Sequence, residues 1–376
     1  MKDFDEMNLN ILLLKGIYSF GFEKPSEIQN KAIPALNTGK NVIAQAQSGT
    51  GKTGAFSIGL LQKIDNTLDK CQGLILSPTR ELAEQTFEVV TSLSKFMNIN
   101  VHLSVGGYSV ITEKEKLTSN TVHVVIGTPG RVLQMLEESY LKADNLKIII
   151  LDEADEILKV GFREQIVKIF KFIPEECQRS IFSATMPKES VDISKNFLTD
   201  PINILVKTEQ LTLEGIKQFF VYVSNENAKL DVLLDIYSKL CVSQAIIFVN
   251  SKRKVNILTE NLKSNGFSVG FMHSEMTMKE RSDVYLKFRR GYIRIVVTTD
   301  ILSRGIDVQG ISFVINYDIP RNKEVYLHRI GRSGRYGKKG VAINFITDDD
   351  IKDLRAIEMF YSTEIEEMPD NIESYF

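Results

Sequence analysis

Residues 46 to 53 have the types and spacing of a phosphate-binding loop. Their sequence is Ala-Gln-Ser-Gly-Thr-Gly-Lys-Thr, with a short apolar run before it at 41–44 and an apolar helical stretch after it at 54–61. A strand that enters a glycine-bearing loop and opens a helix presents unpaired N–H groups to an anion, and the helix dipole favours negative charge there. Lys52 would reach the terminal phosphates of a nucleotide, and the Thr53 hydroxyl would ligate Mg²⁺. The predicted nucleotide-binding residues are Ala46, Gln47, Ser48, Gly49, Thr50, Gly51, Lys52 and Thr53.

Two acidic side chains, Asp152 and Glu153, come directly after the apolar run 148–151. A phosphate-loop enzyme places its magnesium carboxylate at such a strand end, so we assign Asp152 to the metal and Glu153 to polarising the attacking water. The structural alternative is a helix N-terminus at which two acids make favourable contacts with the helix dipole. The presence of Lys52 and Thr53 elsewhere in the chain favours the catalytic interpretation.

The segment 328–335, His-Arg-Ile-Gly-Arg-Ser-Gly-Arg, carries three arginines. A planar cation that cannot lose its proton suits the charge that develops on a transferring phosphoryl group, and such an arginine is worth about 10³ to 10⁵ in rate. These arginines lie far along the chain from Lys52. Catalysis would therefore need two domains to close on one nucleotide, and a second ligand could control that closure. The alternative is a solvated basic helix end.

Short apolar runs alternate with helical stretches along the whole chain and predict the elements that position these groups. Runs rich in Val, Ile and Leu that helices separate indicate parallel sheets covered on both faces. A chain of 376 residues exceeds what one core usually fills, and the polar stretch 207–215 interrupts the rhythm, so we expect two tandem α/β domains. The expected strands lie at 41–44, 73–76, 101–105, 122–126, 148–151, 181–182 and 202–206, and then at 219–223, 245–249, 269–272, 295–297, 313–315 and 341–345.

Polar clusters follow these expected strands, and in open parallel sheets ligands bind beyond the carboxyl ends of the strands. The clusters are small, hydroxylic or cationic and contain almost no aromatic residues. That inventory suits phosphate and sugar contacts rather than base edges, so binding of nucleic acid would tolerate sequence changes and depend on salt. The predicted contacts are Pro78, Thr79, Arg80, Gly106, Gly107, Thr128, Arg131 and Thr299.

The composition is that of an ordinary globular protein, with 43% hydrophobic and 25% charged residues and a net charge of −2. The charge is unevenly distributed, because residues 208–347 carry +8 and residues 348–376 carry −8. That imbalance allows either a phosphate-binding face or a merely solvated positive surface. No apolar run is long enough to span a bilayer, the polar start is unlike a secretory signal, and the three cysteines lie far apart without ligand spacing. We expect a protein of a reducing compartment without a membrane segment or a zinc site.

Taken in order along the chain, the motifs resemble those of a DEAD-box RNA helicase. The matching segments are 78–83, 128–131, 152–155, 183–185, 304–307 and 328–335. The resemblance implies two RecA-like domains at 1–207 and 217–376, joined by a linker at 208–216. It also implies ATP with Mg²⁺ as cofactors, and single-stranded RNA or short RNA duplexes as partners across both domains.

The same resemblance implies roles for residues that spacing alone leaves open. Residues 21–29 resemble the Q motif, so Phe22 would stack on adenine and Gln29 would hydrogen-bond its edge. Asp307 would contact the ribose, Arg332 and Arg335 would be the arginine fingers, and His328 would link the second domain to the carboxylate site. Arg281 would bind RNA. The chain departs from the family pattern at 273–276, where His-Ser-Glu-Met replaces the usual His-Gly-Asp-Met, and at Met278, where glutamine is usual.

Within the family, segments 4–9, 211–216 and 365–369 are similar to the translation initiation factor 4A group. That similarity implies a cytoplasmic, monomeric helicase that opens short RNA duplexes and docks on a helical-repeat scaffold like initiation factor 4G. A nuclear RNA clamp or ribosome-assembly helicase of the same group, with little turnover, is the alternative. A small-molecule kinase with a phosphate loop would leave the distal arginines without a role.

Overall fold

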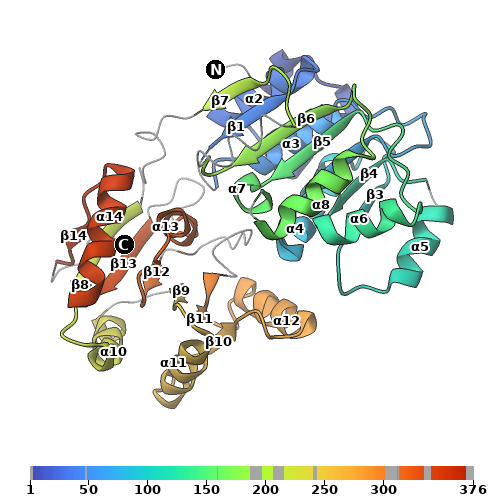
Figure 1. Cartoon of the computed structure of the whole chain (residues 1–376). Coiled ribbons are helices and arrows are strands. Elements are labelled where there is room, and N and C mark those ends of the chain that lie inside the picture. The colour runs from blue at the N-terminus through green and yellow to red at the C-terminus, as the bar shows by residue number, and fades with distance from the viewer. Residues whose placement is uncertain are drawn as a thin grey trace. The chain divides into compact units, whose positions relative to one another are not determined.

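The computed structural model describes residues 3–46, 49–119, 121–158, 160–186, 197–205, 216–239, 244–300, 311, 313–333 and 340–369. The chain divides into two compact units, Met1–Val206 and Lys207–Phe376, which are drawn in Figure 1. Most of the predicted linker lies outside the described residues, and its last residue, Ile216, is already the first residue of a strand.

The first unit is built on a seven-stranded sheet in which neighbouring strands pair in parallel, in the order β3-β4-β2-β5-β6-β1-β7. Its strands are β1 Val42–Gln45, β2 Gly73–Leu76, β3 Val101–Ser104, β4 Val124–Gly127, β5 Ile148–Asp152, β6 Gln178–Ser183 and β7 Ile202–Leu205. Its helices are η1 Phe4–Met7, α1 Ile11–Phe20, α2 Glu27–Asn37, α3 Lys52–Leu61, α4 Arg80–Leu93, α5 Val110–Ser119, α6 Pro129–Glu137, α7 Ala154–Ile157 and α8 Val160–Phe170.

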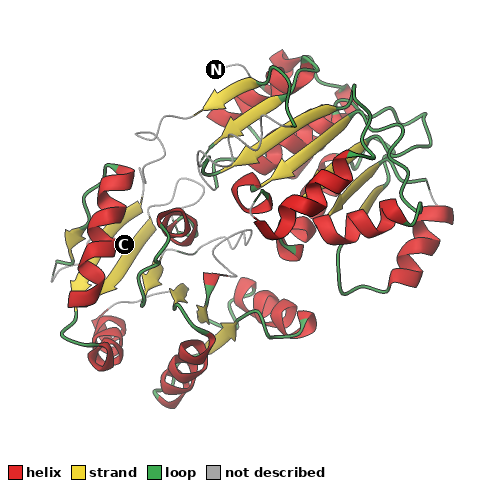
Figure 2. Ribbon diagram, viewed as in Figure 1, coloured by secondary structure: helices red, strands yellow, loops and turns green. Residues whose placement is uncertain are grey.

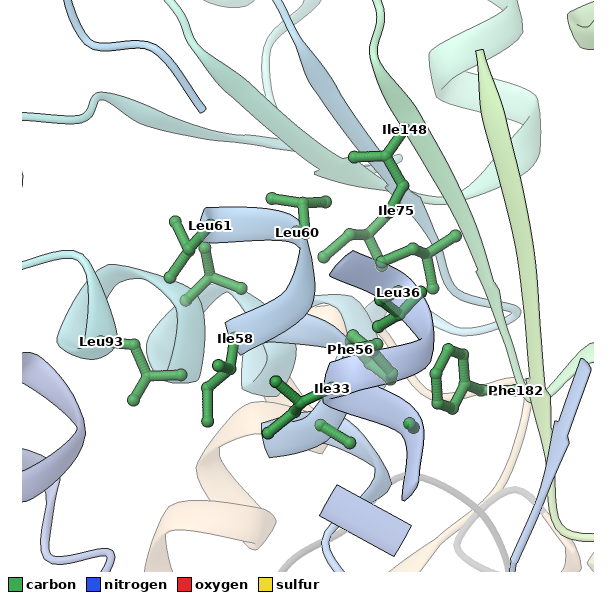
Figure 3. Close-up of a cluster of buried hydrophobic side chains, with 14 of the residues drawn as sticks. Ile33, Leu36, Phe56, Ile58, Leu60, Leu61, Ile75, Leu93, Ile148 and Phe182 are labelled. Atoms are coloured by element: carbon green, nitrogen blue, oxygen red, sulfur yellow. The ribbon is translucent and has the colours of Figure 1, made fainter. Parts of the chain in front are cut away.

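Helices cover both faces of this sheet, as Figure 2 shows, which explains why its strands read as continuous apolar runs. The core on one face joins the sheet to η1 and α1–α4, and Figure 3 shows part of this core around Phe56 and Phe182. The core on the other face joins the sheet to α6, α7 and α8. Because every strand runs in the same direction, all carboxyl ends meet at one edge of the sheet.

The second unit repeats this plan with a seven-stranded sheet of parallel pairs, in the order β10-β11-β9-β12-β13-β8-β14. Its strands are β8 Ile216–Tyr222, β9 Ala245–Phe248, β10 Val269–Met272, β11 Ile295–Thr298, β12 Phe313–Asn316, β13 Gly340–Ile346 and β14 Glu366–Glu367. Its helices are η3 Glu226–Ala228, α10 Lys229–Lys239, α11 Lys252–Ser264, α12 Met278–Arg289, α13 Lys323–Ile330, η5 Asp348–Asp350 and α14 Ile351–Tyr361.

Both units confirm the predicted fold class of tandem, mostly parallel sheets with helices on both faces. Each predicted strand corresponds to an observed one to within a few residues, whereas the two-residue β14 was not expected. Among the described helices, none has the length and apolar character needed to cross a lipid bilayer.

Candidate nucleotide site and nucleic-acid rim

The phosphate loop joins β1 to α3, as expected. Gly49 and Gly51 have φ angles of 84° and 99°, in the left-handed region that favours glycine, and Gly51 is the N-cap of α3. Lys52 is the first residue of the helix, and its buried side chain donates from Nζ to the Ala46 carbonyl oxygen at 2.9 Å. Thr53 is half-buried in the same first turn. Gln47 and Ser48 lie outside the described residues.

Gln29 packs against the start of α3. Its Nε2 donates to the Gly51 carbonyl oxygen at 3.4 Å, and its Oε1 accepts from the Ser26 backbone N–H at 2.9 Å, which forms part of a capping box. A Cβ on Gly54 would lie 2.6 Å from Gln29 Nε2 and 2.9 Å from Phe22 Cε2. The glycine at 54 therefore allows both side chains to approach the helix closely.

Phe22 belongs to a small aromatic group at the same place. Its ring stacks on that of Phe4 with centroids 6.3 Å apart, and it meets Phe20 edge-on at 4.9 Å. The ring remains half-exposed. The structure thus brings Phe22 and Gln29 together beside the phosphate loop, while their contact with adenine stays a prediction.

Asp152 and Glu153 end β5 and are both buried. Burial raises the pKa of Asp152 to about 8, with a contribution from the nearby charge of Glu153, and Lys52 opposes the rise. Lys52 Nζ lies 3.9 Å from Glu153 Oε1. Asp152 Oδ2 is buried and has no hydrogen-bond partner among the described residues. A buried carboxylate oxygen in that situation suits a hard cation, so the donor set fits Mg²⁺.

The third acid of this segment, Asp155, is bound to the end of β6. Ser183 donates from its hydroxyl to Asp155 Oδ1 at 2.7 Å, and Thr185 donates from its hydroxyl to Oδ2 at 2.7 Å. This contact places 183–185, one of the segments that match the family motifs, directly against the acidic segment. A shift of either strand end would therefore be transmitted to the other.

Arg80 holds the loop that follows β3. Its Nε donates to Glu84 Oε1 at 2.8 Å, and its Nη1 donates to the Gly106 carbonyl oxygen at 3.0 Å. Its guanidinium lies 4.1 Å from the centroid of the Tyr108 ring. Gly106 and Gly107 are exposed at the tip of this loop, and Gly107 has a φ of 86°.

Arg131 is buried and forms an ion pair with Glu113 of α5. Its Nη2 donates to the Tyr108 carbonyl oxygen at 3.2 Å, so Arg131 also fixes the loop after β3. Burial alone would raise the pKa of Glu113, but hydrogen bonds from His102, Ser104 and Arg131 and the charge of Arg131 hold that pKa below its usual range. The predicted RNA contact of Arg131 stays a prediction, and the structure favours a positioning role.

The predicted nucleic-acid contacts at the carboxyl ends of the strands form what we call the nucleic-acid rim. Its remaining residues in the first unit follow strands, as the sequence predicts. Pro78 and Thr79 follow β2, and the Thr79 hydroxyl caps α4 by accepting from the Leu82 N–H at 3.3 Å. Thr128 follows β4 and is the N-cap of α6. These residues share one edge of the sheet with the Arg80 loop and with Asp152.

In the second unit, Arg329 is completely buried and joins three strand ends. Its Nε donates to Asp300 Oδ1 at 2.6 Å, and its Nη2 donates to Asn250 Oδ1 at 2.9 Å. Its Nη1 donates to Asn316 Oδ1 at 3.2 Å and to the Asp318 carbonyl oxygen at 2.7 Å. Arg329 is therefore an internal support for the loops after β9, β11 and β12. Sequence reasoning missed this role.

His328 lies in the last turn of α13, and Arg332 lies just beyond the end of that helix. Arg332 donates from Nε to the His328 carbonyl oxygen at 3.1 Å. The predicted second finger, Arg335, and the predicted ribose contact, Asp307, lie outside the described residues.

Thr299 follows β11 and is half-buried, and Arg281 lies half-buried in the first turn of α12. A complete capping box starts this helix, because Thr277 and Glu280 bond each other's backbone N–H. This box fixes the helix start whatever residue occupies 278. Glu275, one of the departures from the family pattern, forms an exposed ion pair with Lys252.

Comparison with known proteins is consistent with this geometry. The profile of the DEAD/DEAH box helicase family matches residues 26–193, and that of the helicase conserved C-terminal domain matches residues 228–337. The chain is 53% identical over 369 residues to ATP-dependent RNA helicase eIF4A of Pyricularia oryzae, covering 98% of this chain and 93% of the relative. It is 52% identical over 370 residues to eukaryotic initiation factor 4A of Drosophila melanogaster, covering 98% and 92%.

Among solved structures, S. cerevisiae Dbp5 bound to RNA and ADP BeF3 is 37% identical and superposes with a TM-score of 0.93, covering 100% of this chain and 97% of that one. The first helicase profile covers the phosphate loop and the carboxylates, and the second covers the arginines of 328–335. The chain belongs to the DEAD-box family of ATP-dependent RNA helicases, in which the two relatives named above carry the initiation factor 4A name.

Proposed function

We propose that this ATP-dependent RNA helicase binds ATP on the first unit and hydrolyses it with groups from both units. The observation that carries the proposal is the buried cluster of Lys52, Asp152 and Glu153 at the phosphate loop, in which one Asp152 oxygen has no partner among the described residues. The N-terminus of α3 and the side chain of Lys52 would bind the phosphates. Phe22 and Gln29, packed on the same helix, would hold the adenine.

Asp152 of this cluster and the Thr53 hydroxyl in the first turn of α3 would hold Mg²⁺. When bound, the ion would neutralise charge on the phosphates and orient them for in-line attack. Glu153 would polarise the attacking water, because its carboxylate follows directly after Asp152 and lies near Lys52. Because burial and the charge of Glu153 raise the pKa of Asp152, this carboxylate would hold Mg²⁺ more tightly as the pH rises.

The second unit would supply the cations that stabilise the transition state. We assign this role to Arg332 and Arg335, while Arg329 is committed to internal hydrogen bonds. His328 would connect α13 to the carboxylate site, and Asp307 would contact the ribose. Hydrolysis would then depend on closure of the two units, which RNA bound along both rims would promote.

RNA would be held through its backbone by the rim residues Thr79, Arg80, Gly106, Gly107 and Thr128 of the first unit and Arg281 and Thr299 of the second. Such contacts tolerate any sequence and weaken with salt. The two relatives named above carry the initiation factor 4A name, which supports a cytoplasmic role in translation initiation. A monomer docked on a scaffold like initiation factor 4G is the assembly we expect.

Two measurements on the intact chain test this function. ATP hydrolysis should rise several-fold when single-stranded RNA is added, and a duplex of about ten base pairs should open in an ATP-dependent way. The Lys52→Ala variant should lose both activities, whereas Lys142→Ala, a change at an exposed position of the same unit, should keep them. Equal turnover with and without RNA would contradict the coupling.

A further inference from the structure

Strand β3 is an edge of the first sheet, and half of its backbone groups face away from that sheet. Asn100 and Ser104 accept from the N–H groups of Val124 and Thr128 and therefore face β4. In a parallel ladder alternate residues face opposite sides, so the N–H and C=O groups of Val101 and Leu103 point outward. A strand edge of this kind is a template for pairing with another chain.

A cavity of about 850 Å³ runs along this outward edge. Its lining includes residues 100–103 of the edge, together with Phe87 of α4 and Thr112, Glu113 and Lys116 of α5. This volume lies within the range of ligand-binding sites and is large enough for a short peptide.

The two walls of the cavity differ in chemistry. Val101 and Leu103 pack into the core cluster on the α4 side, with Phe87 beside them, so that wall is apolar. His102 points to the opposite face, where its Nε2 lies 3.4 Å from Glu113 Oε1. Glu113 is already compensated by Arg131, whereas Lys116 is exposed. The α5 wall therefore offers a positive charge, and the α4 wall offers apolar surface.

The cavity also touches the nucleic-acid rim. Tyr108 lines it, and the Tyr108 ring and carbonyl are the contacts of Arg80 and Arg131. Glu113 lines it as well and pairs with Arg131. A ligand in the cavity would thus contact Tyr108 and Glu113, which pair with the arginines that hold the loop 106–108.

We propose that this cavity binds an extended peptide of a partner protein, in which apolar residues alternate with acidic ones, as an added strand beside β3. The outward groups of Val101 and Leu103 would supply main-chain hydrogen bonds, the α4 wall would take the apolar side chains, and Lys116 would attract the acidic ones. We also propose that this binding changes RNA affinity through Tyr108 and Glu113. The second claim depends on the proposed RNA contacts, and the first does not.

The first claim is tested with the intact chain and an acetylated, amidated peptide of four Val-Glu repeats. Binding should be saturable and should protect the amides of Val101 and Leu103 from hydrogen exchange. Only one alternate set of peptide N–H groups can face β3, so N-methylation of one set should abolish binding and methylation of the other should leave it. Equal effects of the two methylated peptides, or no saturable binding, would overturn the docking claim.

The charge at position 116 and the alternation of residues in the peptide are each tested against a matched control. Lys116→Glu should weaken binding of the Val-Glu peptide about fivefold, whereas Lys142→Glu, the same change at an exposed position that does not line the cavity, should leave it within about twofold. A Val-Lys peptide and a Val-Val-Glu-Glu repeat of equal length should bind more weakly. Equal affinity for all three peptides would show that the site has no such specificity.

The coupling claim is tested by RNA titration with and without the Val-Glu peptide. The peptide should change the RNA dissociation constant by about threefold or more, and RNA should change the peptide constant by the same factor. Peptide binding without any change in RNA affinity would refute the coupling. The Arg80→Ala variant measured without peptide separates the cases, because unchanged RNA affinity there would refute the proposed RNA contact and leave the docking site standing.

Discussion

At Glu153 the backbone leaves β5 in a left-handed conformation with φ of 48°. A residue other than glycine pays about 1 to 3 kcal/mol for such a conformation, and strain of this kind is kept where the surroundings determine it. Here the turn places two acids in succession beside Lys52. The sequence predicted a role in metal binding and catalysis for the two acids, but it held no sign of the backbone conformation at Glu153.

Replacement of Glu153 by glutamine keeps the size of the side chain and removes its charge. We expect ATP binding to remain within about threefold of the wild type, while the rate of hydrolysis falls by about 10² to 10⁴, the usual worth of a general base. Single-turnover hydrolysis and a nucleotide titration measure the two effects. Glu164→Gln, on an exposed face of α8, should change neither quantity. Loss of nucleotide binding in step with hydrolysis would contradict the assigned role.

Replacement of Gly54 by alanine tests the packing of Phe22 and Gln29 on α3. The new Cβ would lie under 3.0 Å from both side chains, so both must move. We expect ATP affinity to fall about tenfold, as a loss of one to two contacts implies. Gly161→Ala in α8 is the matched control, because nothing lies within 4 Å of its added Cβ. Equal ATP affinity in both variants would show that these side chains do not hold the adenine.

At the scale of elements, Asp318 connects the end of β12 to α10 and α11. It accepts from the Asn250 N–H at 2.8 Å and pairs with Lys254 at 2.7 Å and Lys229 at 3.4 Å. Burial alone would raise the pKa of Asp318, but these hydrogen bonds and charges hold it below its ordinary value of 3.8. The carboxylate therefore stabilises the second unit above that pH and loses its contribution as the pH falls below it.

Asp318→Asn should accordingly lower the free energy of unfolding by about 1 to 3 kcal/mol at pH 7, because Lys229 stays buried with a weaker set of partners. The difference from the wild type should shrink as the pH drops below 3.8. Urea unfolding at pH 7 and at pH 3 measures both values. An equal loss of stability at the two pH values would mean that the charge of Asp318 is not what stabilises the unit.

The elements themselves could be predicted from sequence far better than their contacts. Buried parallel strands read as apolar runs, so each sheet and its carboxyl edge followed from the pattern. The three arginines of 328–335 look alike in sequence, and only the fold shows that Arg329 turns inward to Asp300 and Asn250. The cavity beside β3 could not be foreseen either, because no motif relates His102 to Glu113.

At the scale of the whole molecule, the groups that we propose as catalytic belong to two units, each with its own sheet. The first unit contains the phosphate loop and both carboxylates, and the second contains the arginines. An enzyme arranged in this way can bind a nucleotide without hydrolysing it and hydrolyse it only when RNA is present. Dependence on RNA would then follow from the division of the site.

The most direct test is the intact chain with Arg332→Ala, assayed for ATP binding and for RNA-stimulated hydrolysis. We predict that ATP affinity stays within about threefold, because the first unit holds the nucleotide, and that RNA-stimulated hydrolysis falls by about 10³ or more. Arg163→Ala, at an exposed position on α8, is the control and should keep both. Hydrolysis by Arg332→Ala at the rate of the wild type would contradict the claim that the second unit completes the catalytic site.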